Sequence, residues 1–351
     1  MRIIILLCVL LLSCNDSKKI EDKLLNNNVL RNFSKLALCE TIDKLNYNTR
    51  EYYFSNAAII KNDGDNVYIY DKKMFYITDK QLKPNNIVSL KEIDYIIKGK
   101  VSDFEVINNK IIILDASRIL KQISITNDFE ITEIKLENSN EKNSYTGSYS
   151  SISNFRNIGL ITVNPLIPLN YQNINEVTLG NLFNLDGSLQ RTYSIPINKI
   201  DANWKENVDF VYVTSFNDLI YFSFQISRKI FVFGSDGVFI NELIHPIDKK
   251  YWTQPNISNS KIDIGNSISS VPLIKYVTLN TNSFQHDNKY FYCLMYQGKQ
   301  KSPKLLKCDK EFKIIDEIIL DSIPPNMGYK INFIDDRIFL FHDLIYVICN
   351  K

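Results

Sequence analysis

Alanine is nearly missing from this chain of 351 residues, in which five Ala stand against forty Asn. Alanine is the best helix former, whereas aromatic and β-branched residues suit the pleated, half-buried surface of a sheet. Tyr and Phe are plentiful, with twenty of each. The composition therefore excludes a mostly helical protein. Intrinsic disorder is excluded as well, because hydrophobic residues make up 45% of the chain and the net charge is small.

An excess of charge of one sign is also missing, since 41 basic residues nearly balance 39 acidic ones. No global field attracts nucleic acid, and we expect no nucleic-acid partner. The motifs of catalysis are missing too, because the sequence has no Gly-rich phosphate loop, GxSxG elbow or HExxH. The three His are far apart and no CxxC pair exists, which disfavours a zinc site. We therefore expect no cofactor and assign no catalytic residue.

The apolar run at the N-terminus is short. It covers residues 3–12 after Met1-Arg2, whereas a transmembrane helix needs about 20 apolar residues. It is typical of an export signal that is cleaved. Residues 11–14 read Leu-Leu-Ser-Cys and resemble the bacterial lipobox, and this resemblance implies that Cys14 is acylated and becomes the first mature residue. The alternatives are an ordinary secretory signal or a membrane anchor.

The export signal and the lipobox divide the chain into three predicted regions. Residues 1–13 form the lipoprotein signal peptide, residues 14–31 are a polar tether of mixed charge, and residues 32–351 form the folded domain. We expect the protein in the cell envelope, anchored in the outer membrane by lipid on Cys14. An exported compartment permits disulfides. Cys293 and Cys308 flank a turn at 297–303 and could face each other across a hairpin, but such a position does not guarantee disulfide geometry, and the bridge is left open.

The domain contains six copies of one unit. Each copy has an Asn/Asp turn that leads into a strongly apolar second strand, then a third strand, a polar turn and a fourth strand. The expected second strands are 67–70, 110–114, 158–163, 219–224, 290–295 and 338–341. Four antiparallel strands repeated around an axis predict an all-β, six-bladed β-propeller. The opening strand of the first unit is expected near 52–60. The alternatives are a pair of β-sandwiches or a β-solenoid, and the unequal spacing of the copies disfavours the solenoid.

The last copy has no fourth strand, because the chain stops at Lys351 soon after the expected third strand at 344–349. Open sheet edges promote aggregation, so a propeller must close its ring. The apolar segment 33–39 is free to supply the missing strand. We therefore predict that an N-terminal strand closes the ring in the last blade.

The lipobox at 11–14 and units such as Asp218-Leu-Ile-Tyr-Phe-Ser-Phe followed by Phe233-Gly-Ser-Asp-Gly237 carry a resemblance to a known group. The chain resembles the six-bladed propellers of the NHL and TolB-like group, and in particular the envelope lipoproteins of Bacteroidota-type bacteria. The resemblance covers about residues 33–351 and implies the propeller fold. That group includes hydrolases, binding modules and scaffolds, so the fold selects no function.

Long connecting segments gather at one end of the predicted propeller, at 137–150, 164–176, 196–207, 244–270 and 297–303. Loops on a rigid scaffold commonly carry binding sites, and exposed Trp and Tyr are favoured anchors. The candidate ligand-binding residues there are Trp204, His245, Lys249, Lys250, Tyr251, Trp252, Tyr171 and Tyr149. The alternatives are that the aromatic residues fold back as lids and that the two lysines are simply solvated.

These features lead to three hypotheses of function. The first is a lipid-anchored propeller without catalysis that binds a protein or glycan ligand at its long-loop end. The second is a calcium-dependent hydrolase of a lactone or glycan, because some six-bladed hydrolases of the similar group hold calcium in the central channel. The candidate calcium donors are Asn56, Asp103, Asn154, Asp209 and Asn332. The third is a structural subunit of an envelope complex.

Overall fold

The structure is a computed structural model, and it describes most of the strands and the turns that join them. The described residues are 36–54, 59–89, 101–115, 119–125, 130–137, 151–163, 175–199, 211–216, 218–224, 227–245, 261–264, 267–270, 284–286, 290–295, 302–324, 330–335, 337–341 and 344–350. The signal peptide and the tether lie outside these ranges, so their boundaries stay predictions.

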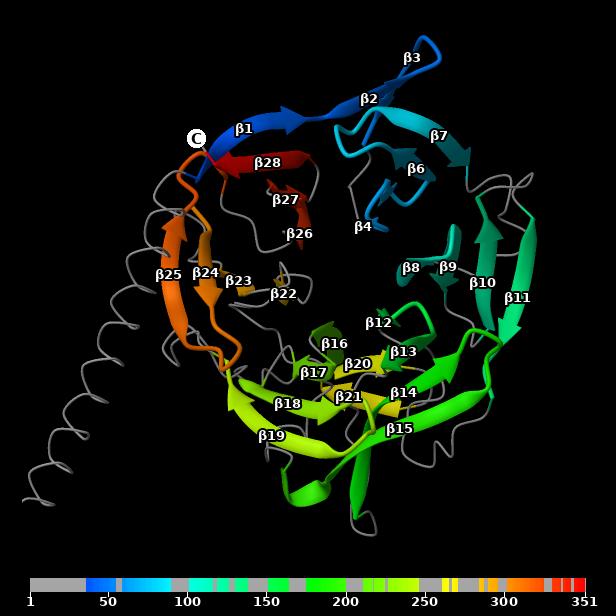
Figure 1. Ribbon diagram of the computed structural model, residues 1–351, viewed down its shortest axis with the longest axis vertical. Helices are drawn as coiled ribbons and strands as arrows, with labels where there is room; N and C mark the ends of the chain where they lie inside the picture. The colour runs from blue at the N-terminus through cyan, green and yellow to red at the C-terminus, as the bar shows by residue number, and fades with distance from the viewer. Residues whose placement is uncertain are drawn as a thin grey trace, which may run out of the picture.

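Six four-stranded antiparallel sheets stand around a common axis as the blades of a propeller (Figure 1). The first blade consists of β4(Ile59–Asn62), β5(Val67–Tyr70), β6(Met74–Thr78) and β7(Pro84–Ser89). The second consists of β8(Asp103–Ile107), β9(Lys110–Leu114), β10(Ile119–Ser124) and β11(Ile131–Lys135). The third consists of β12(Ser151–Phe155), β13(Gly159–Val163), β14(Glu176–Asn184) and β15(Leu189–Pro196). The all-β, six-bladed prediction is confirmed.

The remaining blades follow the same order from the inner to the outer strand, and the last one takes its outer strand from the N-terminus. They are β16(Val211–Phe216), β17(Leu219–Phe224), β18(Lys229–Gly234) and β19(Phe239–Ile244), then β22(Phe284–His286), β23(Phe291–Met295), β24(Lys304–Cys308) and β25(Ile314–Ile319), then β26(Lys330–Ile334), β27(Arg337–Phe341), β28(Ile345–Asn350) and β1(Leu36–Ile42). The six sheets are called blades 1 to 6 below, in this order.

Two short hairpins are additional to the blades. One is β2(Lys44–Tyr47) with β3(Arg50–Tyr53), and the other is β20(Lys261–Ile264) with β21(Ser267–Ser270). The first hairpin corrects the expected opening strand near 52–60, because Tyr52 lies in β3 and the inner strand of blade 1 begins at Ile59. The described residues contain one short 3-10 helix, Ile197–Lys199, and no helix among them is long and apolar enough to cross a membrane.

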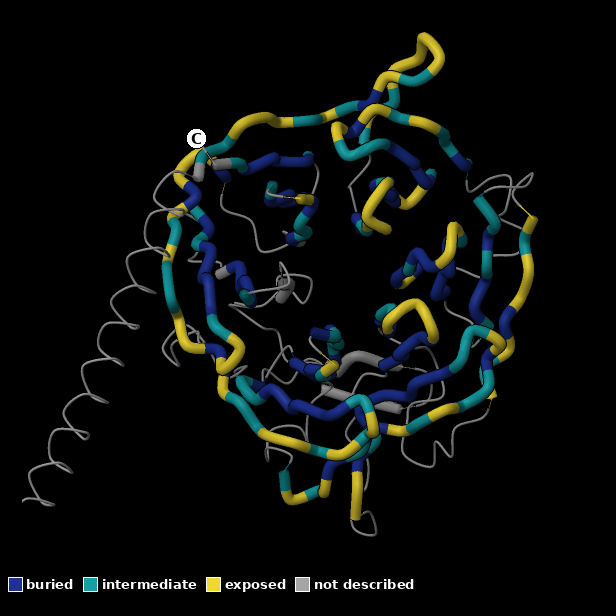
Figure 2. Tube along the Cα trace, in the orientation of Figure 1, coloured by how far each residue is buried: buried dark blue, intermediate teal, exposed yellow. Residues whose placement is uncertain are grey.

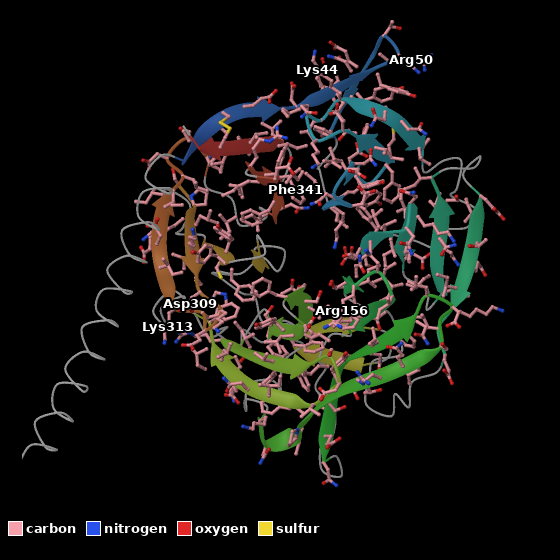
Figure 3. The ribbon with its side chains drawn as sticks, in the orientation of Figure 1. Lys44, Arg50, Arg156, Asp309, Lys313 and Phe341 are labelled. Carbon is pink, nitrogen blue, oxygen red and sulfur yellow. A yellow bond between two sulfur atoms is a disulfide. The ribbon has the colours of Figure 1, made fainter. Side chains whose placement is uncertain are left out.

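The ring closes where the first and last of the described strands pair. Strand β1 pairs antiparallel with β28, with Leu38 opposite Ile348 and Ile42 opposite Ile345. A disulfide joins Cys39 to Cys349 across this pair, with the two Cα atoms 6.1 Å apart (Figure 3). The predicted N-terminal closure is confirmed.

The closing disulfide was not predicted from the sequence, and the pair that was considered is unbridged. Cys293 and Cys308 are both buried and free of a disulfide. The register explains why, because Cys293 lies opposite Leu306 while Cys308 lies opposite Phe291. The two cysteines are therefore diagonal neighbours and not directly opposed residues.

Asparagine shapes the turns between the first and second strands, as the sequence predicts. Asn108 and Asn109 have φ of 50° and 59°, and Arg156 and Asn157 have φ of 53° and 58°. Two successive residues with positive φ form the type I′ turn, whose twist matches that of the flanking strands. Asn tolerates this conformation better than other residues that have a Cβ. The scarcity of glycine is compatible with tight hairpins for this reason.

The core of the protein lies between the blades. Each of its six apolar clusters joins two adjacent blades, and together the clusters link all six blades into a closed ring. Side chains alternate between the two faces of a strand. Ile59 therefore packs toward blade 2 and Ile60 toward blade 6. The second and third strands are buried on both faces, and exposed residues collect on the outer strands (Figure 2). This explains why the second strands are continuously apolar in the sequence.

Candidate functional site

The inner strands bring polar side chains to the axis of the ring. The strands β26, β4, β8, β12 and β16 contact one another in sequence around the axis (Figure 1). Apolar residues of these strands fill the interfaces between blades, and the polar ones collect where adjacent inner strands meet. The densest polar group comes from blades 1, 2 and 3.

This group, which we call the axial cluster, consists of Lys61, Asp103, Glu105 and Ser151. The Lys61 Nζ donates to Glu105 Oε1 at 2.5 Å and lies 3.7 Å from Asp103 Oδ1. Asp103 Oδ2 accepts hydrogen bonds from Ser151 Oγ at 2.8 Å and from the backbone N–H of Ile152 at 3.1 Å. The cluster therefore ties three inner strands together through charged and hydroxyl groups.

Burial sets the electrostatics of the axial cluster. Burial of the Lys61 ammonium lowers its pKa, but the Asp103 and Glu105 carboxylates outweigh this effect, so that the pKa of Lys61 lies above its ordinary value. Burial also raises the pKa of Glu105, and the attraction of Lys61 compensates only in part. Lys61 is thus protonated at neutral pH, and the two carboxylates give the cluster an excess of one negative charge when both are ionised.

Two members of the axial cluster lie at one particular end of the ring. Asp103 and Ser151 are the first residues of β8 and β12. A strand of the inner ring begins where the connection from the preceding outer strand arrives, and 137–150, one of the long segments, is such a connection. The side chains of Lys61, Asp103 and Glu105 retain exposures of 24%, 9% and 13%, so the cluster is accessible in part.

Three of the predicted calcium donors lie on inner strands, but the structure gives each a different partner. Asp103 belongs to the axial cluster. Asn154 Oδ1 accepts from the backbone N–H of Asn157 at 2.9 Å, in the turn that follows β12. Asn332 Oδ1 accepts from Phe333 N at 2.7 Å, and its Nδ2 donates to Ile60 O at 2.8 Å. These two amides hold a turn and a contact between blades.

The calcium site itself stays a prediction. Asn56 and Asp209 lie outside the described residues. Within the described ranges, no three His, Cys, Asp or Glu side chains group as metal ligands would. The axial cluster supplies two carboxylates and a hydroxyl, and the ammonium group of Lys61 lies beside both carboxylates.

Of the predicted ligand-binding residues, the structure describes His245 alone, which follows β19 directly and is 1% exposed. Its backbone N–H donates to Arg228 O at 2.6 Å, and Arg228 Nη2 donates to His245 O at 3.0 Å. Burial, with a smaller effect of Arg228, lowers the pKa of His245 to about 3, so the ring is neutral at physiological pH. The remaining candidates lie outside the described residues: Trp204, Lys249, Lys250, Tyr251, Trp252, Tyr171 and Tyr149, and also the lipidation residue Cys14.

The sequence analysis missed Lys61, Glu105 and Ser151. The signal that could have revealed two of them is a charge inside an inner strand, as in Ile59-Ile60-Lys61 and Phe104-Glu105-Val106. A buried charge costs free energy unless it is paired, so charges at these positions predict partners on an adjacent blade. The partner itself could not be chosen without the order of the blades in space.

The comparisons with known proteins give a fold but no family, because neither a family model nor a curated protein matches the sequence. Among solved structures, a Bacteroides fragilis protein described as exported is 12% identical at a TM-score of 0.53, covering 91% of this chain and 96% of the other. A streptogramin B lyase is 13% identical at a TM-score of 0.50, covering 91% and 99%. BamB from Moraxella catarrhalis is 8% identical at a TM-score of 0.48, covering 90% and 99%. At such identities the likeness to the first two structures shows a shared fold alone.

Proposed function

We propose that this protein is a lipid-anchored propeller of the cell envelope, in the outer membrane, which binds a protein or glycan ligand at the end of the ring where the long segments gather. The observation that carries the proposal is the axial cluster, of which Asp103 and Ser151 lie at that end. Charged side chains that are paired with one another inside a protein are candidate functional groups. Lys61, Asp103 and Glu105 are such charges.

Two further observations support an exported location. The lipobox pattern at 11–14 ends in Cys14. The disulfide between Cys39 and Cys349 is of a kind that persists in oxidising compartments and is rare in the cytosol. A lipid anchor would hold a binding module at the membrane, and a disulfide that closes the ring would stabilise it outside the cytosol.

The anchoring is tested by replacing Cys14 with alanine. We expect the variant to lose incorporation of a labelled fatty acid and to leave the membrane fraction or remain as an uncleaved precursor, because a thiol at the cleavage site is the acceptor of the lipid. Cys8→Ala is the matched control, since Cys8 lies inside the apolar run and should leave labelling unchanged. Label retained by Cys14→Ala would mean that the anchor lies elsewhere.

Binding at the long-loop end is tested with a photo-crosslinking amino acid in living cells. We expect the probe at position Trp252 to give a discrete crosslinked product, because an aromatic anchor near the site would contact the ligand. The control is the same probe at Tyr53, which is 58% exposed on the β2–β3 hairpin outside the ring. Products of equal yield at both positions, or none at Trp252, would contradict the proposal.

A further inference from the structure

The third strand of blade 2 departs from the repeat. The residue of the third strand that lies opposite the middle of the second strand is buried and apolar in five blades. These residues are Tyr76, Leu182, Val232, Leu306 and Val347, opposite Ile69, Ile161, Tyr221, Cys293 and Phe339 respectively. None of the five is more than 3% exposed. Blade 2 has Gln122 at this position, opposite Ile112.

The turn between the third and fourth strands differs among the blades. In blades 1 and 5, the turn between the third and fourth strands carries Leu82 or Phe312 at positive φ, and each side chain is buried against the preceding blade. Phe312 joins the cluster that contains Val232. The corresponding turn residues of blades 3 and 4 are Gly187 and Gly237, with φ of 91° and 84°. Gly187 lies directly against β11, where an added Cβ would meet the backbone oxygen of Lys135.

A cavity of about 310 Å³ lies between blades 2 and 3, and Gln122 is part of its lining. A volume of this size is at the lower end of the range for small-molecule sites, about 300–1,000 Å³. Aliphatic side chains of Ile107, Ile112, Ile134 and Leu185 line part of it. The polar residues of the lining are Asn108, Lys110, Gln122, Glu133 and Asp186.

The walls of the cavity are fixed by hydrogen bonds. Glu137 N donates to Gly187 O at 2.9 Å, and Glu137 Oε2 accepts from Leu189 N at 2.8 Å, which holds the turn of blade 3 against the end of β11. Gln122 Nε2 donates to Thr132 Oγ1 at 3.1 Å across β10 and β11. The cavity is thus preformed, which reduces the entropy that a ligand would lose on binding.

The charges around the cavity balance. Glu133 is paired at 2.7 Å with Lys121, which is 1% exposed, and the remaining charges are those of Lys110 and Asp186. The lining itself holds one cation, Lys110, and two anions, Glu133 and Asp186, and Lys121 neutralises Glu133 from outside the lining, so the charges give no preference for a charged ligand. The amides of Asn108 and Gln122 both donate and accept hydrogen bonds, as hydroxyl groups do. An aliphatic wall beside such groups fits the mixed surface of a sugar ring.

We propose that this cavity is a second binding site, for a neutral saccharide of the size of a monosaccharide. The site is lined by blade 2 and the turn of blade 3, and it is separate from the axial cluster. Asn108, Lys110, Gln122 and Asp186 bind the hydroxyl groups, and Ile112 and Ile134 contact the apolar face of the ring. The inference does not rest on the function proposed above, because it uses none of the same residues.

The test is saturation-transfer NMR of the full chain with glucose, galactose and N-acetylglucosamine, and with glycine as a zwitterionic probe. We expect transfer to at least one of the sugars and none to glycine. In Gln122→Leu, which restores the pattern of the other blades, we expect about tenfold weaker binding of that sugar, because a hydrogen-bonding amide is lost and the cavity becomes apolar. Asp186→Asn, on the exposed turn, should weaken binding in the same direction.

The matched control is Gln81→Leu, which makes the same change on an exposed turn of blade 1 away from the cavity. Binding equal to that of the unmodified protein is expected there. Gln122→Leu should melt at or above the temperature of the unmodified protein, which separates loss of the site from loss of the fold. The proposal is overturned if none of the three sugars binds, if glycine binds in their place, or if Gln122→Leu binds the sugar as well as Gln81→Leu does.

Discussion

Replacing Cys349 by serine is expected to lower the free energy of unfolding by about 2–4 kcal/mol, the usual contribution of a disulfide that closes a long loop. Cys39 and Cys349 are 310 residues apart, so the bond constrains nearly the whole unfolded chain. It also holds β1 against β28, and without it the outer strand of blade 6 can leave and expose an unpaired edge. Chemical denaturation followed by tryptophan fluorescence measures the effect.

The controls for the disulfide use the other cysteines and a reductant. Cys39→Ser and the double variant should match Cys349→Ser, because removing either sulfur breaks the same bond. A reductant should destabilise the unmodified protein and have no further effect on Cys349→Ser, since Cys293 and Cys308 are unbridged. Equal denaturation midpoints for the unmodified protein and Cys349→Ser would show that the bond does not hold the ring closed.

Replacing Lys61 by methionine is expected to destabilise the protein by about 3–5 kcal/mol at neutral pH, the usual effect of removing one partner of a buried ion pair. The variant keeps the Asp103 and Glu105 carboxylates side by side without the ammonium that separates them. The matched control is Lys44→Met, which removes an ion pair with Glu51 of the same 2.5 Å length on the exposed β2–β3 hairpin. Lys44→Met should lower the free energy of unfolding by less than about 1 kcal/mol.

The decrease in the free energy of unfolding caused by Lys61→Met should become smaller as pH falls. Burial already raises the pKa of Glu105 in the folded protein, and removing the nearby cation raises it further. A group that binds its proton more tightly when folded stabilises the protein at low pH and loses that contribution as pH rises. The difference between Lys61→Met and the unmodified protein should therefore shrink as pH falls toward 4.5, the ordinary pKa of a glutamate side chain.

Denaturation curves of both proteins between about pH 4 and pH 8 measure this dependence. Glu105→Gln in the Lys61→Met background should remove most of it, because the titrating carboxyl is then missing. A loss that is the same at every pH would mean that the lysine acts through packing of its aliphatic chain and not through its charge.

The strands and their turns could be predicted from the sequence because they are local. The apolar second strand at 110–114 and the Asn108-Asn109 turn before it are encoded within a few residues, by burial on both faces and by the tolerance of asparagine for positive φ. Repetition of this unit six times determined the propeller. The missing fourth strand of the last copy determined that an N-terminal segment closes it.

The sites depend on contacts between blades, and these were decided only by the tertiary structure. Lys61 and Asp103 are 42 positions apart in the sequence, and Cys39 and Cys349 are 310 apart. No local pattern selects such partners, because each residue has several chemically equivalent candidates and only the closing of the ring brings one within reach. The cavity beside Gln122 likewise depends on a turn of the next blade, which supplies Leu185 and Asp186 to its lining. Sequence periodicity determined how many blades form, and the packing of one blade on the next decided where charges pair and where space remains.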